Sequence, residues 1–200
     1  MERLLFIYNP RAGRDKIRPA LSDIINKLTE NGFLVTTYPT QAPKDAGDAI
    51  TKWGAAFDRI VVAGGDGTLN EAVNGLLRLS DRPTIGYLPV GTTNDFSRNL
   101  DLPTGLLNLA EVATNGIPRP CDVGRLNGRL FLYVAAFGAF TEVSYDTPQA
   151  SKNLLGYTAY LFESVKYWGS LKPYHVRIQY DHEQTLEGDY LYVMVSNSTS

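Results

Sequence analysis

The chain has 200 residues, of which 44% are hydrophobic and 20% are charged, and its formal net charge is −2. This is the composition of a globular chain with enough apolar residues for a sizeable core. The small net charge argues against wholesale binding of nucleic acid, so we expect no nucleic-acid partner. A single cysteine, Cys121, excludes an internal disulfide and suits a reducing compartment.

The first predicted element is an apolar strand at residues 4–8. Because it begins almost at the first residue, we expect no secretory signal peptide and a cytoplasmic protein. The longest uncharged stretch, residues 130–141, is shorter than the roughly 18 apolar residues that a membrane-spanning helix needs. Any contact with a membrane is therefore expected to be peripheral.

Strands and helices alternate from residue 4 to about residue 115. Further strands are predicted at residues 33–38, 58–63 and 84–89, and helices at residues 21–28, 45–53 and 106–113, with another after residue 68. This alternation predicts an α/β fold with a doubly wound parallel sheet.

A glycine turn, Gly64-Gly65-Asp66-Gly67-Thr68, follows the buried strand at residues 58–63. Its glycines let backbone N–H groups approach a ligand closely, and a helix start beside them favours phosphate. Thr68 followed by Glu71 predicts a capping box. Asp66 is unusual, because a carboxylate repels phosphate unless a metal ion or water lies between them. The alternative is a tight strand-to-helix turn in which Asp66 is a second capping group.

Two more polar turns follow predicted strands. They are Asn9-Pro10-Arg11-Ala12-Gly13, after the first strand, and Gly91-Thr92-Thr93-Asn94-Asp95, after the strand at residues 84–89. Taken alone, each could be an ordinary loop. Because the carboxyl ends of parallel strands lie at one edge of a sheet, we expect all three turns to converge on a phosphate site.

The pattern changes after residue 118. Residues 122–126 and 129–136 around Asn127-Gly128 predict a β-hairpin, and strands are predicted at residues 175–180 and 190–196, with turns over residues 181–188. An aromatic-rich helix at residues 152–168 is typical of core packing or of a lid that faces lipid. We therefore predict two domains, 1–118 and 119–200, the second an incomplete β-sandwich with a helical insert at about 150–169.

The sequence lacks the residues that several kinds of chemistry require. The glycine turn has no P-loop lysine, no nucleophile elbow is present, and no Cys/His spacing predicts zinc. His175 and His182 are expected at the surface or in packing. What remains is backbone amides for phosphate and three carboxylates, Asp66, Asp95 and Asp122, that could hold Mg²⁺ directly or through water. These are the groups that enzymes use for phosphoryl transfer.

The three turns, in this order and each after a strand, resemble the diacylglycerol kinase catalytic-domain family, which includes bacterial soluble diacylglycerol kinases and the sphingosine and ceramide kinases. Gly64-Gly65-Asp66-Gly67-Thr68 alone is shared with NAD kinases, but the set of three is specific. The similarity extends to Asp122-Val123-Gly124 and residues 155–160. It implies a kinase that transfers the γ-phosphate of Mg-ATP to the hydroxyl of diacylglycerol or a related lipid. It also implies an active site between a nucleotide-binding domain and a lipid-substrate domain.

The resemblance also implies roles for individual residues. Asp66, Asp95 and Asp122 would be catalytic and would hold Mg²⁺ and its waters. The residues implied to bind ATP are Asn9, Pro10, Arg11, Ala12, Gly13, Thr40, Gly64, Gly65, Asp66, Gly67, Thr68, Leu69, Asn70, Glu71, Gly91, Thr92 and Asn94.

Two departures from the family pattern bear on these expectations. The family's Phe-x-Asn reads Phe131-Leu132-Tyr133 here. The family's later segment, with an Asp-Gly metal loop and a general base, lies beyond Ser200, so this chain is expected to bind nucleotide but to turn over poorly. An NAD kinase-like phosphotransferase and a nucleotide-binding protein without catalysis stay open as alternatives. The identity of the lipid and a homodimeric state are open as well.

Overall fold

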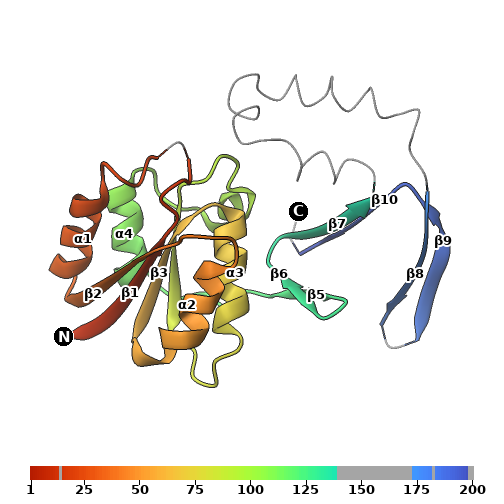
Figure 1. The fold of residues 1–200 in the computed structure, drawn as a ribbon, viewed down its shortest axis with the longest axis horizontal. Coiled ribbons are helices and arrows are strands. Elements are labelled where there is room, and N and C mark those ends of the chain that lie inside the picture. The colour runs from red at the N-terminus through yellow and green to blue at the C-terminus, as the bar shows by residue number, and fades with distance from the viewer. Residues whose placement is uncertain (14, 139–172, 182, 198–200) are drawn as a thin grey trace. The chain divides into compact units, whose positions relative to one another are not determined.

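The computed structural model describes residues 1–13, 15–138, 173–181 and 183–197 (Figure 1). These residues belong to two compact units, one of Met1–Tyr133 with Asn197–Ser200 and one of Val134–Ser196. The predicted helix at residues 152–168 and His182 lie outside the described residues. No helix within the described ranges has the length and apolar character needed to cross a membrane.

The first unit is built on a four-stranded parallel sheet. Its strands are β1 (Glu2–Tyr8), β2 (Phe33–Pro39), β3 (Arg59–Gly64) and β4 (Thr84–Pro89), in the order β2-β1-β3-β4. All neighbouring strands run parallel. The four strands predicted from the sequence are therefore confirmed.

Helices cover both faces of this sheet. They are α1 (Leu21–Glu30), α2 (Asp45–Trp53), α3 (Asp66–Leu76) and α4 (Leu106–Asn115). Two short 3₁₀ helices lie in the connections, η1 (Gly54–Ala56) after α2 and η2 (Asp95–Leu100) after β4. Figure 1 shows α1 and α4 on one side of the sheet and α2 and α3 on the other. The predicted doubly wound α/β fold is confirmed.

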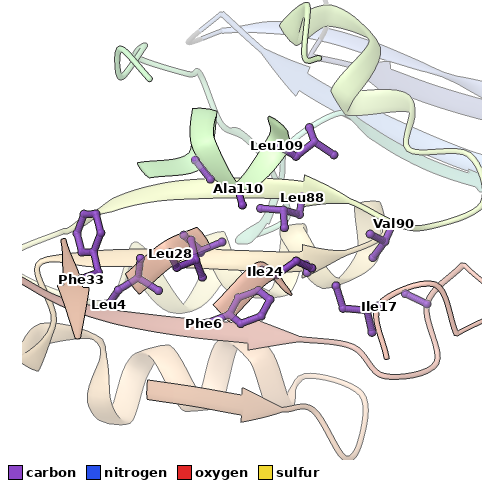
Figure 2. Packing of buried hydrophobic residues seen from close by; sticks show 14 residues of the cluster. Leu4, Phe6, Ile17, Ile24, Leu28, Phe33, Leu88, Val90, Leu109 and Ala110 are labelled. Atoms are coloured by element: carbon purple, nitrogen blue, oxygen red, sulfur yellow. The ribbon is translucent and has the colours of Figure 1, made fainter. Parts of the chain in front are cut away.

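The two faces explain why the strands are continuously apolar. Successive strand residues point to opposite sides, so Leu4 and Phe6 pack beneath α1 and α4, whereas Leu5 and Ile7 pack beneath α2 and α3. Figure 2 shows the cluster on the first face, where Leu4 lies near Leu28 of α1 and Phe6 lies near Ile24 of the same helix. All of these side chains are buried.

The start of α3 differs from the prediction. The helix begins at Asp66, with Gly65 as an extended capping residue, and no side chain caps it. Thr68 is buried, and a Cβ placed on Gly64 would lie 2.5 Å from the Thr68 Cβ. The Thr68–Glu71 capping box is therefore wrong, because the glycines let the chain enter the helix earlier and turn Thr68 inward against the strand end.

A polar cluster joins α1 to α4 at the surface. The Lys27 Nζ lies 2.6 Å from one carboxylate oxygen of Glu111, and the Asn115 side chain donates to the other at 2.8 Å. The hydrogen bond from Lys27, together with the amides of Asn115 and Asn31, lowers the pKa of Glu111 to about 2. Because the folded pKa lies below the unfolded value, this carboxylate adds stability above about pH 4.5.

Replacing Glu111 with glutamine tests this contribution. We expect the wild-type chain to lose stability as the pH falls from 4.5 towards 2, because the folded state then gives up its paired carboxylate. Glu111→Gln should flatten this limb of the stability curve, as measured by urea unfolding at a series of pH values. The exposed Glu30→Gln on α1 is the control, and an equal effect of both substitutions would contradict the assignment.

A small hairpin follows the α/β layer. It consists of β5 (Gly124–Leu126) and β6 (Arg129–Phe131), which pair antiparallel. Asn127 and Gly128 have φ values of 47° and 77°, as a type I′ turn requires, so the predicted hairpin is confirmed. The strand predicted at residues 129–136 is divided into two, because the chain bends at Leu132 and Tyr133. The proposed domain boundary at residue 118 stays a prediction.

The second unit contains two antiparallel pairs. β7 (Val134–Gly138) pairs with β10 (Tyr192–Ser196), and β8 (Tyr174–Tyr180) pairs with β9 (Gln184–Tyr190). The turn predicted over residues 181–188 is therefore wrong from residue 184 onward. Its polar composition suits an exposed ribbon, in which cross-strand pairs stabilise the strand.

Those cross-strand pairs are charged. His175 lies 2.8 Å from Asp189, and Arg177 lies 2.6 Å from Glu187. The hydrogen bond to Asp189, with a second one to Glu187, raises the pKa of His175. This part of β9 is thus held by charge pairs across the ribbon, a signal that composition alone does not give.

Candidate phosphate-binding site

The three polar turns predicted from the sequence meet at the carboxyl edge of the parallel sheet. The backbone N–H of Asn9 donates to Ala63 O at 2.9 Å, and that of Val90 donates to Gly64 O at 3.0 Å. The N–H of Thr40 donates to Tyr8 O at 2.9 Å and so continues the β1–β2 ladder. These bonds extend the strand pairing and bring the turns into register.

The first turn is folded back on itself and lies against the third. Asn9 Oδ1 accepts the N–H of Arg11 at 2.9 Å, and Asn9 O accepts that of Ala12 at 3.1 Å. Gly13 has a φ of +58°, and a Cβ at this position would overlap the carbonyl oxygen of Val90. Only glycine fits here without strain. The Arg11 side chain is exposed to solvent.

The second and third turns touch through their backbones. A Cβ placed on Gly91 would lie 2.5 Å from Gly65 Cα and 2.6 Å from Asn94 Oδ1. Asn94 closes its own turn by donating from Nδ2 to Gly91 O at 2.9 Å. Its Oδ1 is buried and has no hydrogen-bond partner among the described residues. The two glycines therefore let the backbones of these turns pack directly against each other.

Asp66 links the second turn to the third. Its carboxylate accepts the backbone N–H of Asp95 at 3.0 Å and that of Phe96 at 3.2 Å. Asp66 thus caps the start of η2, after Asn94 in the left-handed conformation. The alternative that treated Asp66 as a capping group is supported, but the helix that it caps is the one in the next loop. It also stands in the first turn of α3, where a negative charge is favourable.

The structure brings two of the three predicted acidic residues into contact, through the backbone of one of them. The backbone of Asp95 contacts Asp66, and its carboxylate lies 3.4 Å from Arg98 Nη1. Asp122 is exposed, and its carbonyl accepts the Asn197 side chain at 2.8 Å. Among the described residues, no three or more His, Cys, Asp or Glu side chains are arranged to hold a metal ion. Coordination of Mg²⁺ by the three carboxylates, directly or through water, stays a prediction.

The predicted ATP-binding residues divide into two groups. Gly67 and Thr92 are exposed, and nothing lies within 4 Å of a Cβ placed on Gly67. Leu69, at 3% exposed, belongs to the core, and Asn70 Oδ1 accepts the N–H of Leu132 at 3.2 Å. Gly67 and Thr92 can therefore face a ligand, whereas the side chains of Leu69 and Asn70 pack beneath the loops and support them.

Tyr87 on β4 is a supporting residue that the sequence analysis missed. Its buried hydroxyl donates to Gly64 O at 3.2 Å, beneath the glycine turn. Burial, with a smaller effect of Asp66, raises the pKa of this phenol, so it remains a donor. Its only signal in the sequence is that the inward-facing tyrosine of an apolar strand needs a hydrogen-bond partner.

The fold and the site together define a class. A doubly wound α/β layer places glycine-rich loops and the open start of a helix at one sheet edge, which is how proteins of this architecture bind phosphate groups. Residues 3–126 match the model of the diacylglycerol kinase catalytic domain. The chain therefore belongs to the diacylglycerol kinase catalytic domain family.

Individual relatives agree with this assignment. The chain is 40% identical over 202 residues to a diacylglycerol kinase of Bacillus subtilis and 36% identical over 203 residues to one of Staphylococcus saprophyticus, in each case over its full length. It spans 66% and 65% of those proteins.

Solved structures are similar as well. A diacylglycerol kinase from Bacillus anthracis superposes with a TM-score of 0.71 at 31% identity, over 98% of this chain and 63% of that one. Another crystal structure from the same strain gives 0.78 at 34% identity, over 98% and 65%. The four-stranded parallel sheet followed by small antiparallel sheets matches these structures.

Proposed function

We propose that the protein is an ATP-dependent lipid kinase, which transfers the γ-phosphate of Mg-ATP to the hydroxyl of diacylglycerol or a related lipid. The observation that carries the proposal is the convergence of the three turns at the carboxyl edge of the sheet, where Gly67 at the start of α3 is exposed. Membership of the diacylglycerol kinase catalytic domain family supplies the reaction class.

The backbone is suited to hold the phosphates of ATP. The free N–H groups at the start of α3 point away from the helix body, and the absence of a side chain at Gly67 allows a phosphate oxygen to come close. Gly65 and Gly91 keep the second and third turns packed together beside it. Arg11, which is exposed on the first turn, adds positive charge for the outer phosphates.

Mg²⁺ fits this site as an ion held mainly by phosphate and water. Mg²⁺ keeps several waters and takes one or two protein carboxylates where it bridges phosphates. Asp66 and Asp95, joined through the η2 backbone, would orient those waters, and Asp122 would add a third acceptor. The ion would neutralise the charge on the transferred phosphate.

A labelling experiment tests the proposal. The protein and the full-length product of its gene would be incubated with γ-labelled ATP and Mg²⁺, with diacylglycerol micelles, a total lipid extract and NAD offered in parallel. Label in an organic-soluble product would support the lipid kinase and would point to its substrate. Label in NADP would favour the NAD kinase-like alternative. Bound nucleotide without label transfer would favour a protein that has lost catalysis.

The substitution Gly67→Ala separates binding from folding. Because Gly67 lies in the first turn of α3 with open space before it, alanine should raise the free energy of unfolding slightly, by about 0.5 kcal/mol. The new methyl group should weaken ATP binding by roughly 10-fold, about 1.4 kcal/mol, as measured by calorimetry. The unfolding midpoint of the same variant is the control. Unchanged ATP affinity would show that phosphate does not approach this backbone.

A further inference from the structure

The chain passes between the two compact units twice, at residues 133–134 and 196–197. On the side of the first unit, Asn197 ties the two crossings together. Its backbone N–H donates to the carbonyl of Tyr133 at 2.8 Å, and its side-chain amide donates to the carbonyl of Leu132 at 2.8 Å. These two hydrogen bonds therefore hold the second crossing next to the first, at the point where both leave the first unit.

The Asn197 amide also holds the backbone of Asp122, one of the three predicted carboxylates. The same Nδ2 donates to the carbonyl of Asp122 at 2.8 Å. A single side chain therefore bonds to the backbone of Asp122 and to that of Leu132, which precede and follow the β5–β6 hairpin in the chain.

The crossing is held from the other side by α3. Asn70 Oδ1 accepts the N–H of Leu132 at 3.2 Å. Leu132 is buried in a cluster that includes Leu69 and Tyr87, the residues that support the glycine turn. Both polar backbone groups of Leu132 are therefore held by asparagine side chains, one of them on the helix that opens the phosphate site.

We propose that Asn70 and Asn197 are a positioning pair, which clamps the chain crossing at Leu132 to α3. The clamp holds α3, Leu132 and Asn197 together within the first unit, where the chain leaves it and returns to it. Its consequence for catalysis rests on the proposed function, in which residues beyond the crossing take part in binding the lipid. The clamp itself does not depend on that function.

The chemistry of the pair predicts a reciprocal result. Asn70 acts as an acceptor, whereas the Asn197 side chain acts as a donor. Aspartate has the shape of asparagine, keeps the acceptor and loses the donor. Asn70→Asp should therefore preserve the clamp, and Asn197→Asp should break it by facing two carbonyl oxygens with a carboxylate. A role in packing alone would treat the two substitutions alike.

The hydrogen-exchange rate of the Leu132 amide, measured by NMR on the ligand-free protein, reports directly on whether the clamp is formed. We expect Asn70→Asp to lie within about twofold of the wild type, and Asn70→Leu and Asn197→Asp to exchange roughly 5–10-fold faster. The matched control is Asn74→Ala, one turn further along α3, because the Asn74 side chain donates to the backbone carbonyls of Asn70 and Leu130 and, among the described residues, makes no hydrogen bond to Leu132. Equal effects of aspartate at positions 70 and 197, or no effect of either, would overturn the proposal.

Kinase kinetics give the second test. For Asn197→Asp we expect the KM for ATP to stay within about twofold and kcat to fall roughly 10-fold, because small misplacements of reacting groups are costly. Asn74→Ala should keep the wild-type kcat. A similar loss of ATP affinity and kcat in Asn197→Asp would mean general disruption and would overturn the role in positioning. A wild-type protein that phosphorylates no lipid would overturn the proposed function, while the exchange rates would still decide whether the clamp exists.

Discussion

Replacing Asp66 with asparagine is expected to lower turnover by roughly 10²–10³-fold, the usual effect of removing one electrostatic contact to a transition state. The carboxylate also holds the loop, because it accepts the N–H groups of Asp95 and Phe96. Asparagine keeps one oxygen and turns an NH₂ group towards the second N–H donor. We therefore also expect a loss of about 1–3 kcal/mol in the free energy of unfolding.

Parallel measurements on Asp66→Asn separate these two effects. Turnover would be measured in the full-length product of the gene with labelled ATP, and stability by urea unfolding. Asp95→Asn is the matched control for the loop, since among the described residues the Asp95 carboxylate pairs only with the exposed Arg98. This substitution should change stability by less than about 0.5 kcal/mol. Wild-type turnover in Asp66→Asn would remove Asp66 from the mechanism.

Gly13→Ala is expected to cause the largest loss of stability. The substitution forces a side chain into left-handed backbone at a φ of +58° and drives its Cβ into the carbonyl of Val90. The two effects together should lower the free energy of unfolding by about 2–5 kcal/mol, because the obstacle is backbone that cannot rotate away. Moving the first turn off the third should also weaken ATP binding.

Gly32→Ala is the control for Gly13→Ala. Gly32 has a φ of +95°, but nothing lies within 4 Å of a Cβ placed there. It should show only the cost of the left-handed backbone, about 1–2 kcal/mol, and leave ATP affinity unchanged. If both variants lose equal stability by thermal unfolding, the close approach of the first and third turns is not important for the fold.

The sequence by itself determined the elements of the first unit and the edge at which they carry polar turns. The alternation of apolar strands and amphipathic helices has a local period, so residues 4–115 could be assigned without knowledge of their contacts. Asn127-Gly128 likewise predicted its turn, because the φ values that the turn requires suit those two residues. Parallel pairing then placed three separate turns at one edge.

Tertiary structure alone decided what the individual side chains do. Asp66 bonds to backbone 29 and 30 residues away, Asn70 to backbone 62 residues away, and Tyr87 to a carbonyl on the neighbouring strand. Thr68 turned inward instead of capping α3, because a neighbouring glycine left room for it. β9 formed from residues with turn-like composition because its partners lie across the ribbon. Such contacts join distant segments and have no local period, so they arise only when the chain has folded.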